Sequence, residues 1–389
     1  MTASRISYLW NDAYAPKDFA TGVSLHSHTN RSKETLDFIV KLANEHRCFR
    51  DLIQWQHKRV HKKHSLAIDF AAGYWTPPLT PRLAFDLESR QIANELHLQP
   101  LVSITDHDNI QAPMLLRTVA SARHIPVSVE WTTPFGPEQS FHLGIHNLPS
   151  ASGAQWMSEF EEFTERPSDT RLTEMLAALN DIPNVLIVFN HPLWDLYKIG
   201  EQAHVRCVDE FLSQNGDFIH ALELNGLRNW EENRLVKRLA GRWNKLLISG
   251  GDRHGMEPNA NVNLTNASTF NEFVHEIRSE GRSHVLFMPQ YAEPWKHRIL
   301  QSTVDAIRDY PDFPEGSRYW DDRVFHPDIN GCDRPLRQLW PDGQPPVILR
   351  LVVEFVRLIL GGKTVSRGLR LAWNERQQLQ FDLGDQEAF

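Results

Sequence analysis

The sequence contains little cysteine and no long apolar run. Its three cysteines among 389 residues, Cys48, Cys207 and Cys332, are too few and too scattered for a disulfide framework or a CxxC zinc site. The N-terminal segment lacks the basic region followed by an apolar run that a secretory signal needs. The longest apolar stretch, Val347 to Leu360, is interrupted by three charged residues, which argues against a membrane span. We therefore expect a cytoplasmic protein without a membrane partner.

The chain also lacks an excess of positive charge. It has 41 Lys and Arg against 49 Asp and Glu, a formal net charge of -8 at pH 7, which argues against general binding of nucleic acid. The basic stretch HKRVHKKH at residues 57–64 is more typical of a solvated helix face than of a nucleic-acid site. Apolar residues make up 41% of the chain and no residue type dominates, so we expect a globular protein.

Short β-rich runs alternate along the chain with amphipathic segments. This alternation predicts βαβ units and a parallel sheet, and the number of runs would allow closure into a barrel. The β-rich runs are 23–26, 101–105, 127–130, 141–145, 185–190, 221–225 and 246–250, with an eighth at 285–288. The amphipathic segments are 83–96, 172–179, 205–212, 230–243 and 270–278.

Two regions depart from this alternation. Residues 34–80 separate the first run from the next and contain a rigid proline-rich turn, so we interpret them as an insertion. Residues 301–389 begin with a Pro- and Asp-rich segment and then become helical in pattern. The sequence therefore predicts a main domain over 1–300, which includes the insertion, and a mostly helical C-terminal extension over 301–389.

Residues with nitrogen or oxygen ligands lie at or near the ends of nearly all the runs. His26 and His28 form an H-x-H pair, and residues i and i+2 of a strand face the same side. The others are Asp106, His107, Asp108, Glu130, His142, His191, Glu223, Asn225, Asp252 and His254. In parallel α/β barrels the carboxyl ends of the strands converge, so these side chains would meet in one metal cluster. Imidazole and carboxylate without thiolate suit zinc, manganese or iron(II).

Between about Gly22 and Phe287 the chain contains, in this order, the motifs LHSHT, ITDHD, a VE strand end, FHLGIH, FNHP, LELN and GGDRHG. In this order the motifs resemble those of the PHP family, named for its polymerase and histidinol-phosphatase members. The resemblance is greatest to stand-alone bacterial PHP phosphoesterases. It implies a distorted TIM-like (β/α)7 barrel with two or three divalent ions. It further implies His26, His28, Glu130 and Asp252 at one ion, Glu130, His142 and His191 at a second, and His107 and His254 at a third.

The sequence departs from the family pattern after the H-x-H motif. Lys33 stands where the family has an acidic or histidine ligand of the third ion, and an ammonium has no acceptor with which to ligate. Three interpretations follow. The third site is weak or absent, with Lys33 a solvated surface residue; the Lys33 charge replaces the ion and binds substrate; or another residue supplies the ligand. Candidates for that replacement are Glu34, Asp37, His57, His61 and His64.

The resemblance implies hydrolysis of a phosphomonoester or phosphodiester, nucleotides included, by a water shared between two ions. Asp106 would orient a ligand histidine. Arg253 would clamp the phosphate, although strand alternation equally allows it to face outward. Trp75 and Trp131 would either stack on a base or sugar or belong to the core.

Two other functions stay open from the sequence. A C–N hydrolase of the amidohydrolase type uses similar chemistry but usually relies on a carbamylated lysine or a different histidine order. A catalytically degenerate PHP scaffold or binding module would explain Lys33, but the complete set of residues proposed for the first two ions argues against it.

Overall fold

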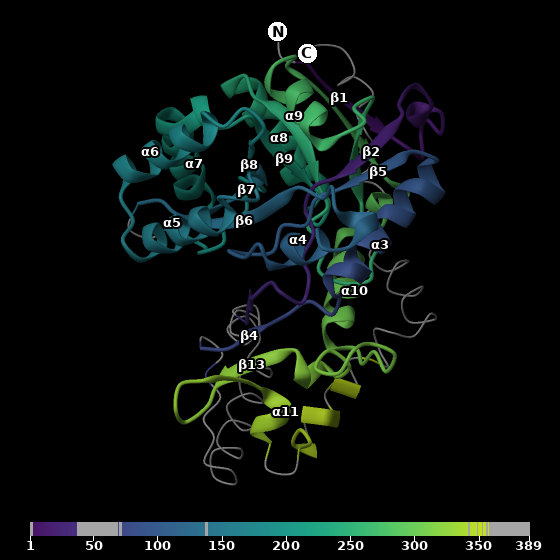
Figure 1. The fold of residues 1–389 in the computed structure, drawn as a ribbon, viewed down its shortest axis with the longest axis vertical. Coiled ribbons are helices and arrows are strands. Elements are labelled where there is room, and N and C mark those ends of the chain that lie inside the picture. The colour runs from purple at the N-terminus through teal and green to yellow at the C-terminus, as the bar shows by residue number, and fades with distance from the viewer. Residues whose placement is uncertain are drawn as a thin grey trace.

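The computed structural model describes residues 3–36, 69, 72–136, 139–340, 343–347, 349–351, 353–354 and 357. These residues form a mixed α/β fold with three β-sheets (Figure 1). Two five-stranded sheets lie in the larger part of the molecule, and a four-stranded sheet lies in a smaller part below it. The predicted α/β class is therefore confirmed.

The first large sheet contains the strand that precedes the H-x-H motif. Its order is β1 (Ala3–Tyr8), β12 (Arg282–Phe287), β11 (Asn261–Thr265), β2 (Thr21–Ser24) and β5 (Gln99–Val102). β1 pairs with β12 and β2 with β5 in parallel, whereas β11 runs antiparallel to both of its neighbours. The sequence pattern predicts neither β1 nor β11, because serine, arginine and asparagine interrupt their apolar positions.

The second large sheet carries most of the other candidate ligands. Its order is β10 (Leu246–Gly250), β9 (Ala221–Asn225), β8 (Leu186–Asn190), β7 (Ser140–Leu148) and β6 (Val127–Pro134). β8, β9 and β10 are parallel, and β7 is antiparallel to β6 and β8. Every residue of β8, β9 and β10 is buried, as expected for strands covered on both faces.

Two isolated parallel bridges connect the ends of these sheets. Ser27 pairs with Arg253, and His107 pairs with Glu130. β10 also packs beside β12. The two large sheets are thus linked at their ends, and their closure into a (β/α)7 barrel stays a prediction.

Helices cover the outer faces of the large sheets (Figure 1). They are α3 (Pro81–Gln91), α4 (Gln111–Leu116), α5 (Gly153–Glu165), α6 (Asp169–Asn180), α7 (Glu201–Asn215), α8 (Trp230–Trp243) and α9 (Phe270–Arg278). Each amphipathic segment predicted from the sequence overlaps one of them. The Asn229 side chain accepts from the backbone N–H of Glu232 (2.8 Å) and caps the start of α8, which satisfies one of its free N–H groups.

An aromatic core fixes the second sheet against its helices. Trp131 of β6 stacks on Phe160 of α5, with ring centroids 4.3 Å apart. Phe189 of β8 lies 5.0 Å from Phe211 of α7. All four side chains are buried. The strand ends that carry the candidate ligands are therefore held by a packed, rigid layer.

The smaller part joins the two regions that interrupt the alternation. Its sheet has the order β14 (Asp333–Pro335), β13 (Val324–Pro327), β4 (Tyr74–Trp75) and β3 (Glu34–Thr35), with antiparallel pairing throughout. β3 and β4 lie near the two ends of the insertion, and β13 and β14 belong to the C-terminal extension. Helix α10 (Trp295–Ile307) leads from the larger part to the smaller, and α11 (Leu336–Leu339) follows β14 (Figure 1).

The structure draws the boundary of the extension differently from the sequence. Helix α10 spans residue 300, and the described residues of 301–389 include the β13–β14 hairpin as well as helices. Most of the insertion, with Asp37, His57, His61 and His64, lies outside the described residues. Within the part of the chain that the structure describes, no helix is long and apolar enough to cross a membrane.

Candidate metal centre

Two pairs of candidate ligands lie side by side where β2 and β10 end. The segments 26–28 and 252–254 form a parallel bridge at their middle residues, Ser27 and Arg253. Two backbone hydrogen bonds of 2.9 and 2.8 Å flank the bridge. Alternate residues of an extended chain face the same side. The outer residues of both segments, three histidines and an aspartate, therefore face one side, and Ser27 and Arg253 face the other.

Glu130 lies at the centre of the cluster and is fully buried. The bridge between His107 and Glu130 brings the end of β5 against β6 and so places this carboxylate. Ring nitrogens of five histidines surround its two oxygens: His26 (3.0 Å), His28 (3.3 Å) and His107 (3.4 Å) at Oε2, and His191 (3.1 Å) and His142 (3.4 Å) at Oε1. One carboxylate thus contacts candidate ligands from both large sheets.

Glu34 closes the cluster on the side of the smaller part. Its Oε2 lies 3.5 Å from His107 Nε2 and 3.4 Å from His254 Nε2. Ser32 Oγ donates to Glu34 Oε1 (2.6 Å) and holds the carboxylate in place. Glu34, one of the replacements considered for the missing third ligand, thus lies at the cluster, and the other candidates lie outside the described residues.

Among the described residues, three groups of side chains have ligand atoms within 4.8 Å of one another. The groups are His26 with His28 and Asp252; His107 with Glu130 and His142; and His28 with Glu34, His107 and His254. The groups share two histidines. Their nitrogen and oxygen donors, without thiolate, fit a divalent ion such as zinc, manganese or iron(II).

An unpaired ring nitrogen supports this fit. Nδ1 of His142 is buried without a hydrogen-bond partner and lies 3.4 Å from Glu130 Oε1. Buried polar atoms of native proteins nearly always have a partner. An ion shared by His142 and Glu130 would provide one for His142.

Burial and opposite charges shift the pKa values within the cluster. Burial disfavours a charge on His26, but the surrounding carboxylates outweigh burial and raise the pKa of His26 well above its usual value. Burial also disfavours the charge on Glu130, yet nearby imidazoles hold the pKa of Glu130 well below its usual value. Burial lowers the pKa of His107 to about 3, so its ring is neutral and able to ligate. The buried carboxylates therefore need positive charge nearby, which divalent ions would supply in place of protons.

Glu223 orients two of the histidines from β9. Its Oε1 lies 2.8 Å from His26 Nδ1, and its Oε2 accepts from the backbone N–H of His191 (2.8 Å). Bonding at Nδ1 turns Nε2 of His26 towards Glu130. Gly250 on β10 makes this possible, because a Cβ atom there would lie 1.4 Å from Glu223 Oε1.

Two asparagines hold the other carboxylates. Asn190 Nδ2 donates to Glu130 Oε1 (2.9 Å), and Asn225 Nδ2 donates to Asp252 Oδ2 (3.0 Å). The sequence pattern singles out Asn225 at a strand end but misses Asn190. Asn190 directly precedes the histidine of the FNHP motif, and this position was the signal that could have identified it.

Two of the cluster residues have a left-handed backbone. His191 has φ +28° and Asp252 has φ +52°, where a Cβ atom is disfavoured. Such conformations persist only where the surrounding structure holds them, and they concentrate at functional sites. Here they occur where β8 and β10 end and the chain turns its side chains into the cluster.

Lys33 does not reach the cluster. Its side chain is 64% exposed, its Nζ lies 3.5 Å from Asp333 Oδ2, and it lies 4.6 Å from the centre of the Tyr74 ring. Strand alternation explains the placement, because Glu34 faces inward and its neighbour Lys33 must face outward. The proposed role of Lys33 as a substitute for the third ion is therefore not supported by its position.

Arg253 also faces away from the cluster. Its Nε donates to Glu88 Oε1 (2.7 Å) in a fully buried ion pair. The outward-facing alternative is thus the one that the structure adopts. Asp106 is buried behind the cluster, where it accepts from the backbone N–H (2.5 Å) and Oγ1 (2.7 Å) of Thr29. It therefore fixes the segment after His28 rather than touching a histidine ring.

Tryptophan residues flank the cluster. Trp75 lies beside His254, with ring centroids 6.1 Å apart, whereas Trp131 is core. Trp194 was not predicted, yet its ring lies 4.9 Å from that of His191. The guanidinium of Arg228 lies over Trp194, 4.8 Å from its centre.

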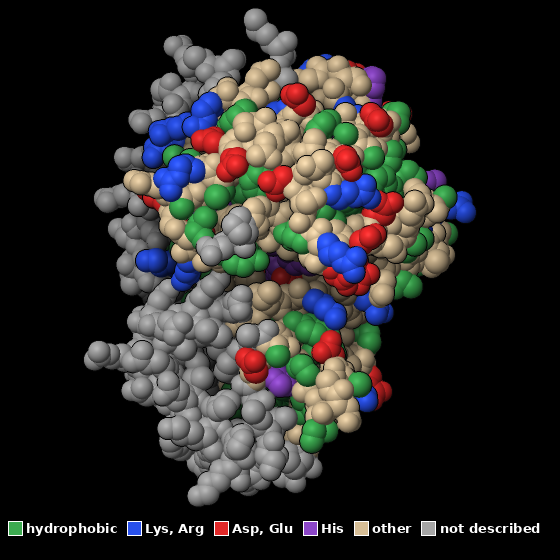
Figure 2. Space-filling view, turned by 90° about the vertical axis from the view of Figure 1, so that its left-hand side faces the viewer, with side chains coloured by type: hydrophobic (Ala, Val, Ile, Leu, Met, Phe, Trp, Pro, Cys, Tyr) green, Lys and Arg blue, Asp and Glu red, His purple; other side chains and the backbone are tan. Residues whose placement is uncertain are grey.

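Histidine and acidic side chains are visible at the bottom of a hollow between the larger and the smaller part (Figure 2). His107 and His254 keep side-chain exposures of 15% and 14%, so a ligand could reach this edge of the cluster.

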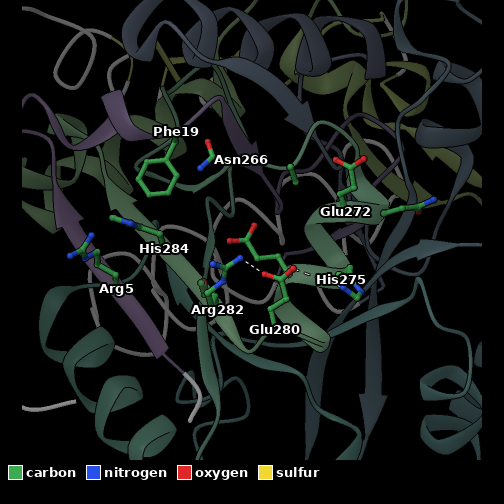
Figure 3. Close-up of a pocket in the computed structure, with 12 residues that line it drawn as sticks. Arg5, Phe19, Asn266, Glu272, His275, Glu280, Arg282 and His284 are labelled. Atoms are coloured by element: carbon green, nitrogen blue, oxygen red, sulfur yellow. Dashed lines mark hydrogen bonds and ion pairs between the residues drawn. The ribbon is translucent and has the colours of Figure 1, made fainter.

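A cavity of about 700 Å³ lies elsewhere (Figure 3). Its lining includes Arg5 of β1 and Arg282 at the beginning of β12, and no residue of the cluster. Arg282 and Glu280, which both line the cavity, form an ion pair (Figure 3). Acidic and basic side chains are mixed along the lining, and none belongs to the cluster.

No family model matches the chain, and no curated protein matches it. Among solved structures, it is similar to an amidohydrolase from Chromobacterium violaceum (15% identity, 46% of this chain and 84% of that one, TM-score 0.32). It is also similar to a protein assigned as a metal-dependent phosphoesterase from Bifidobacterium adolescentis (15% identity, 52% of this chain and 91% of that one, TM-score 0.30). A third similar structure is PsfC from Pseudomonas syringae (12% identity, 57% of this chain and 88% of that one, TM-score 0.35). TM-scores this low add no argument about function, and the PHP assignment stays a resemblance of motifs.

Proposed function

We propose that the chain is a metal-dependent phosphoesterase that hydrolyses a phosphomonoester or phosphodiester. The observation that carries the proposal is the buried Glu130 carboxylate, which lies within 3.4 Å of ring nitrogens from five histidines. A carboxylate in this position can bridge two ions. A carbamylated lysine bridges in many C–N hydrolases, so a glutamate in this role favours the phosphoesterase.

The proposed ligands follow the three groups of the cluster. His26, His28 and Asp252 would hold one ion, His142 and His191 a second, and Glu34, His107 and His254 a third, with Glu130 shared by the first two. Divalent ions there would acidify a water nucleophile and neutralise charge on the phosphate oxygens. Zinc, manganese and iron(II) all suit these donors.

The protein's own groups would orient the reactants. Glu223 holds His26 through Nδ1, and Asn190 fixes Glu130, so the cluster is arranged before substrate arrives. Arg228, held over Trp194 at the His191 side, would attract the anionic phosphate in the role first considered for Arg253. The hollow between the two parts would admit a small-molecule phosphoester.

We further propose that the two large sheets are halves of one distorted barrel. The two bridges join the sheets at both edges of the cluster, at Ser27–Arg253 and His107–Glu130. In such a barrel all strands with candidate ligands would present them at one end.

The test is an assay of chelator-stripped protein reconstituted with zinc, manganese or iron(II). Substrates are phosphomonoesters, phosphodiesters, nucleotides and, for comparison, amides and cyclic imides. We expect release of phosphate or alcohol from a phosphoester only after reconstitution, and not from the Glu130→Gln variant. Hydrolysis of an amide with no phosphoester turnover would contradict the proposal.

A further inference from the structure

The carboxylate at the third group of ligands belongs to a strand of the smaller part. Glu34 lies in β3, which pairs with β4 through Glu34 and Trp75. β4 in turn pairs with β13 through Trp75 and Val324. The backbone N–H of Thr76 also donates to Arg323 O (2.8 Å) just before β13. A continuous hydrogen-bonded sheet therefore runs from the C-terminal extension to Glu34.

Side chains on the outer face of this sheet connect Lys33, the residue just before β3, to β4 and to β14 at the opposite edge of the sheet. Lys33 Nζ lies 3.5 Å from Asp333 Oδ2 of β14 and 4.6 Å from the centre of the Tyr74 ring of β4. Tyr74 stacks on Phe325 of β13, with centroids 5.0 Å apart and the rings inclined by 7°. We call Lys33, Tyr74 and Asp333 the clasp. It ties three strands together directly beside Glu34.

The inner face holds the carboxylate at the cluster. Glu34 is 9% exposed, accepts from Ser32 Oγ (2.6 Å), and faces His107 and His254 at 3.5 and 3.4 Å. Because side chains alternate along a strand, a shift of β3 by one residue would place Lys33 at the cluster in the position that Glu34 now occupies. The register of this two-residue strand therefore decides whether a carboxylate or an ammonium faces the third group.

We propose that the C-terminal hairpin and the clasp position Glu34 to bind the third ion. This inference rests on the metal centre proposed above. The smaller sheet fixes the register of β3, and this register presents Glu34 to His107 and His254. Docking of the C-terminal extension and binding of the third ion are thus coupled, and the coupling is reciprocal. Binding of that ion stabilises the β4–β13 pairing.

The first test reverses the charges of the clasp. Lys33→Asp places an aspartate opposite Asp333 and removes the cation from the Tyr74 ring, so we expect the affinity for the third ion to fall by about tenfold. The double variant Lys33→Asp/Asp333→Lys should recover most of it. Asp312→Asn removes a charge from an exposed site of the same part and serves as the control. Ion content is measured by elemental analysis after equilibration with buffered free manganese, where the first two ions should stay bound in every variant.

The second test measures the reverse coupling. Hydrogen exchange of the backbone amides in β4 and β13 should slow when the third ion binds to the wild-type protein, and Tyr74→Ala should weaken both the protection and the third-ion affinity. If Tyr74→Ala unfolds the smaller part, the milder Lys33→Asp variant answers the question.

Three results would overturn the inference. They are a wild-type protein that binds only two ions, a Lys33→Asp variant that binds the third ion as well as or better than wild type, and a double variant without recovery. None of them depends on substrate turnover. Loss of all phosphoester hydrolysis with normal third-ion behaviour would instead overturn the proposed function and leave the positioning role intact.

Discussion

At the residue scale, the position of Glu130 explains most of the site. It is the acidic group that both large sheets approach, and five imidazoles lie around it. Asn190 donates to one of its oxygens from β8. The surrounding histidines are held by their own partners, such as Glu223 at His26. Removing the charge of Glu130 should therefore affect every group of the cluster.

We expect Glu130→Gln to lower both turnover and divalent-ion affinity by more than about a hundredfold, since loss of an outer partner alone typically costs 10- to 100-fold. An amide cannot bridge two cations as a carboxylate does. Ion affinity is measured by competition with a chromogenic chelator. Asp108→Ala is the control, because Asp108 Oδ1 accepts from the backbone N–H of Thr132 (2.8 Å), outside the cluster. Similar losses in both variants would show that Glu130 has no special role.

The sequence could predict the members of the cluster better than their partners. Histidines and acids at strand ends are visible in the pattern, and eight of them meet in the structure. Strand register is not visible, because β3 has two residues and no periodicity. The choice between Lys33 and Glu34, which differ by one position, therefore could not be made from the sequence. The Arg253–Glu88 pair joins residues 165 positions apart, which no local pattern reveals.

At the element scale, glycine on β10 allows β9 to place its glutamate. Gly250 pairs with Asn225, and the side chain of Glu223 occupies the space where a Cβ atom of residue 250 would lie. The requirement concerns space rather than backbone conformation, since Gly250 is not among the residues with positive φ. Neighbouring strands thus depend on each other for the orientation of His26 and His191.

Gly250→Ala should displace Glu223 and destabilise the fold by about 1–3 kcal/mol, as overpacked sites do. It should also weaken ion binding, because His26 loses its Nδ1 partner. Urea unfolding and the chelator titration measure the two effects. Gly216→Ala is the matched control, since a Cβ atom there would lie 3.9 Å from Cε of Lys245, an ordinary van der Waals contact. Equal stability and ion affinity for the two variants would contradict this account of β9 and β10.

The elements themselves were predictable in part. α8 and α9 agree with their predicted segments because apolar residues recur regularly and Asn229 and Thr269 cap the helices. The small sheet was not predicted. Its strands have two to four residues and come from regions more than 200 positions apart, so only tertiary contacts define them.

At the scale of the whole molecule, buried neutral histidines should make stability depend on pH. Burial lowers the pKa of His220 from 6.5 to about 3, and Arg278 and Lys245 add to the shift. Its Nδ1 accepts from the backbone N–H of Ile187 (2.8 Å). Below pH 6.5 the unfolded chain takes up a proton that the folded chain refuses. The free energy of unfolding therefore falls as the pH drops from 6.5 towards about 3.

His220→Asn should flatten this acid dependence by up to about 1.4 kcal/mol per pH unit, because asparagine can accept from Ile187 but does not titrate. The variant need not match wild type at neutral pH, since the slope and not the absolute stability is compared. Urea titrations at several pH values between 4 and 7 give the slopes. His124→Asn, which removes an exposed imidazole, is the control. An unchanged slope for His220→Asn would show that His220 is not held neutral in the folded protein.

The central claim is that the cluster around Glu130 holds several divalent ions. Anomalous X-ray scattering from crystals soaked in manganese tests it most directly, because it locates each ion among its ligands. We expect peaks on both sides of Glu130, one with His26, His28 and Asp252 and one with His142 and His191, and a third between Glu34, His107 and His254. Crystals that show no anomalous peak within ligand distance of Glu130 would contradict it.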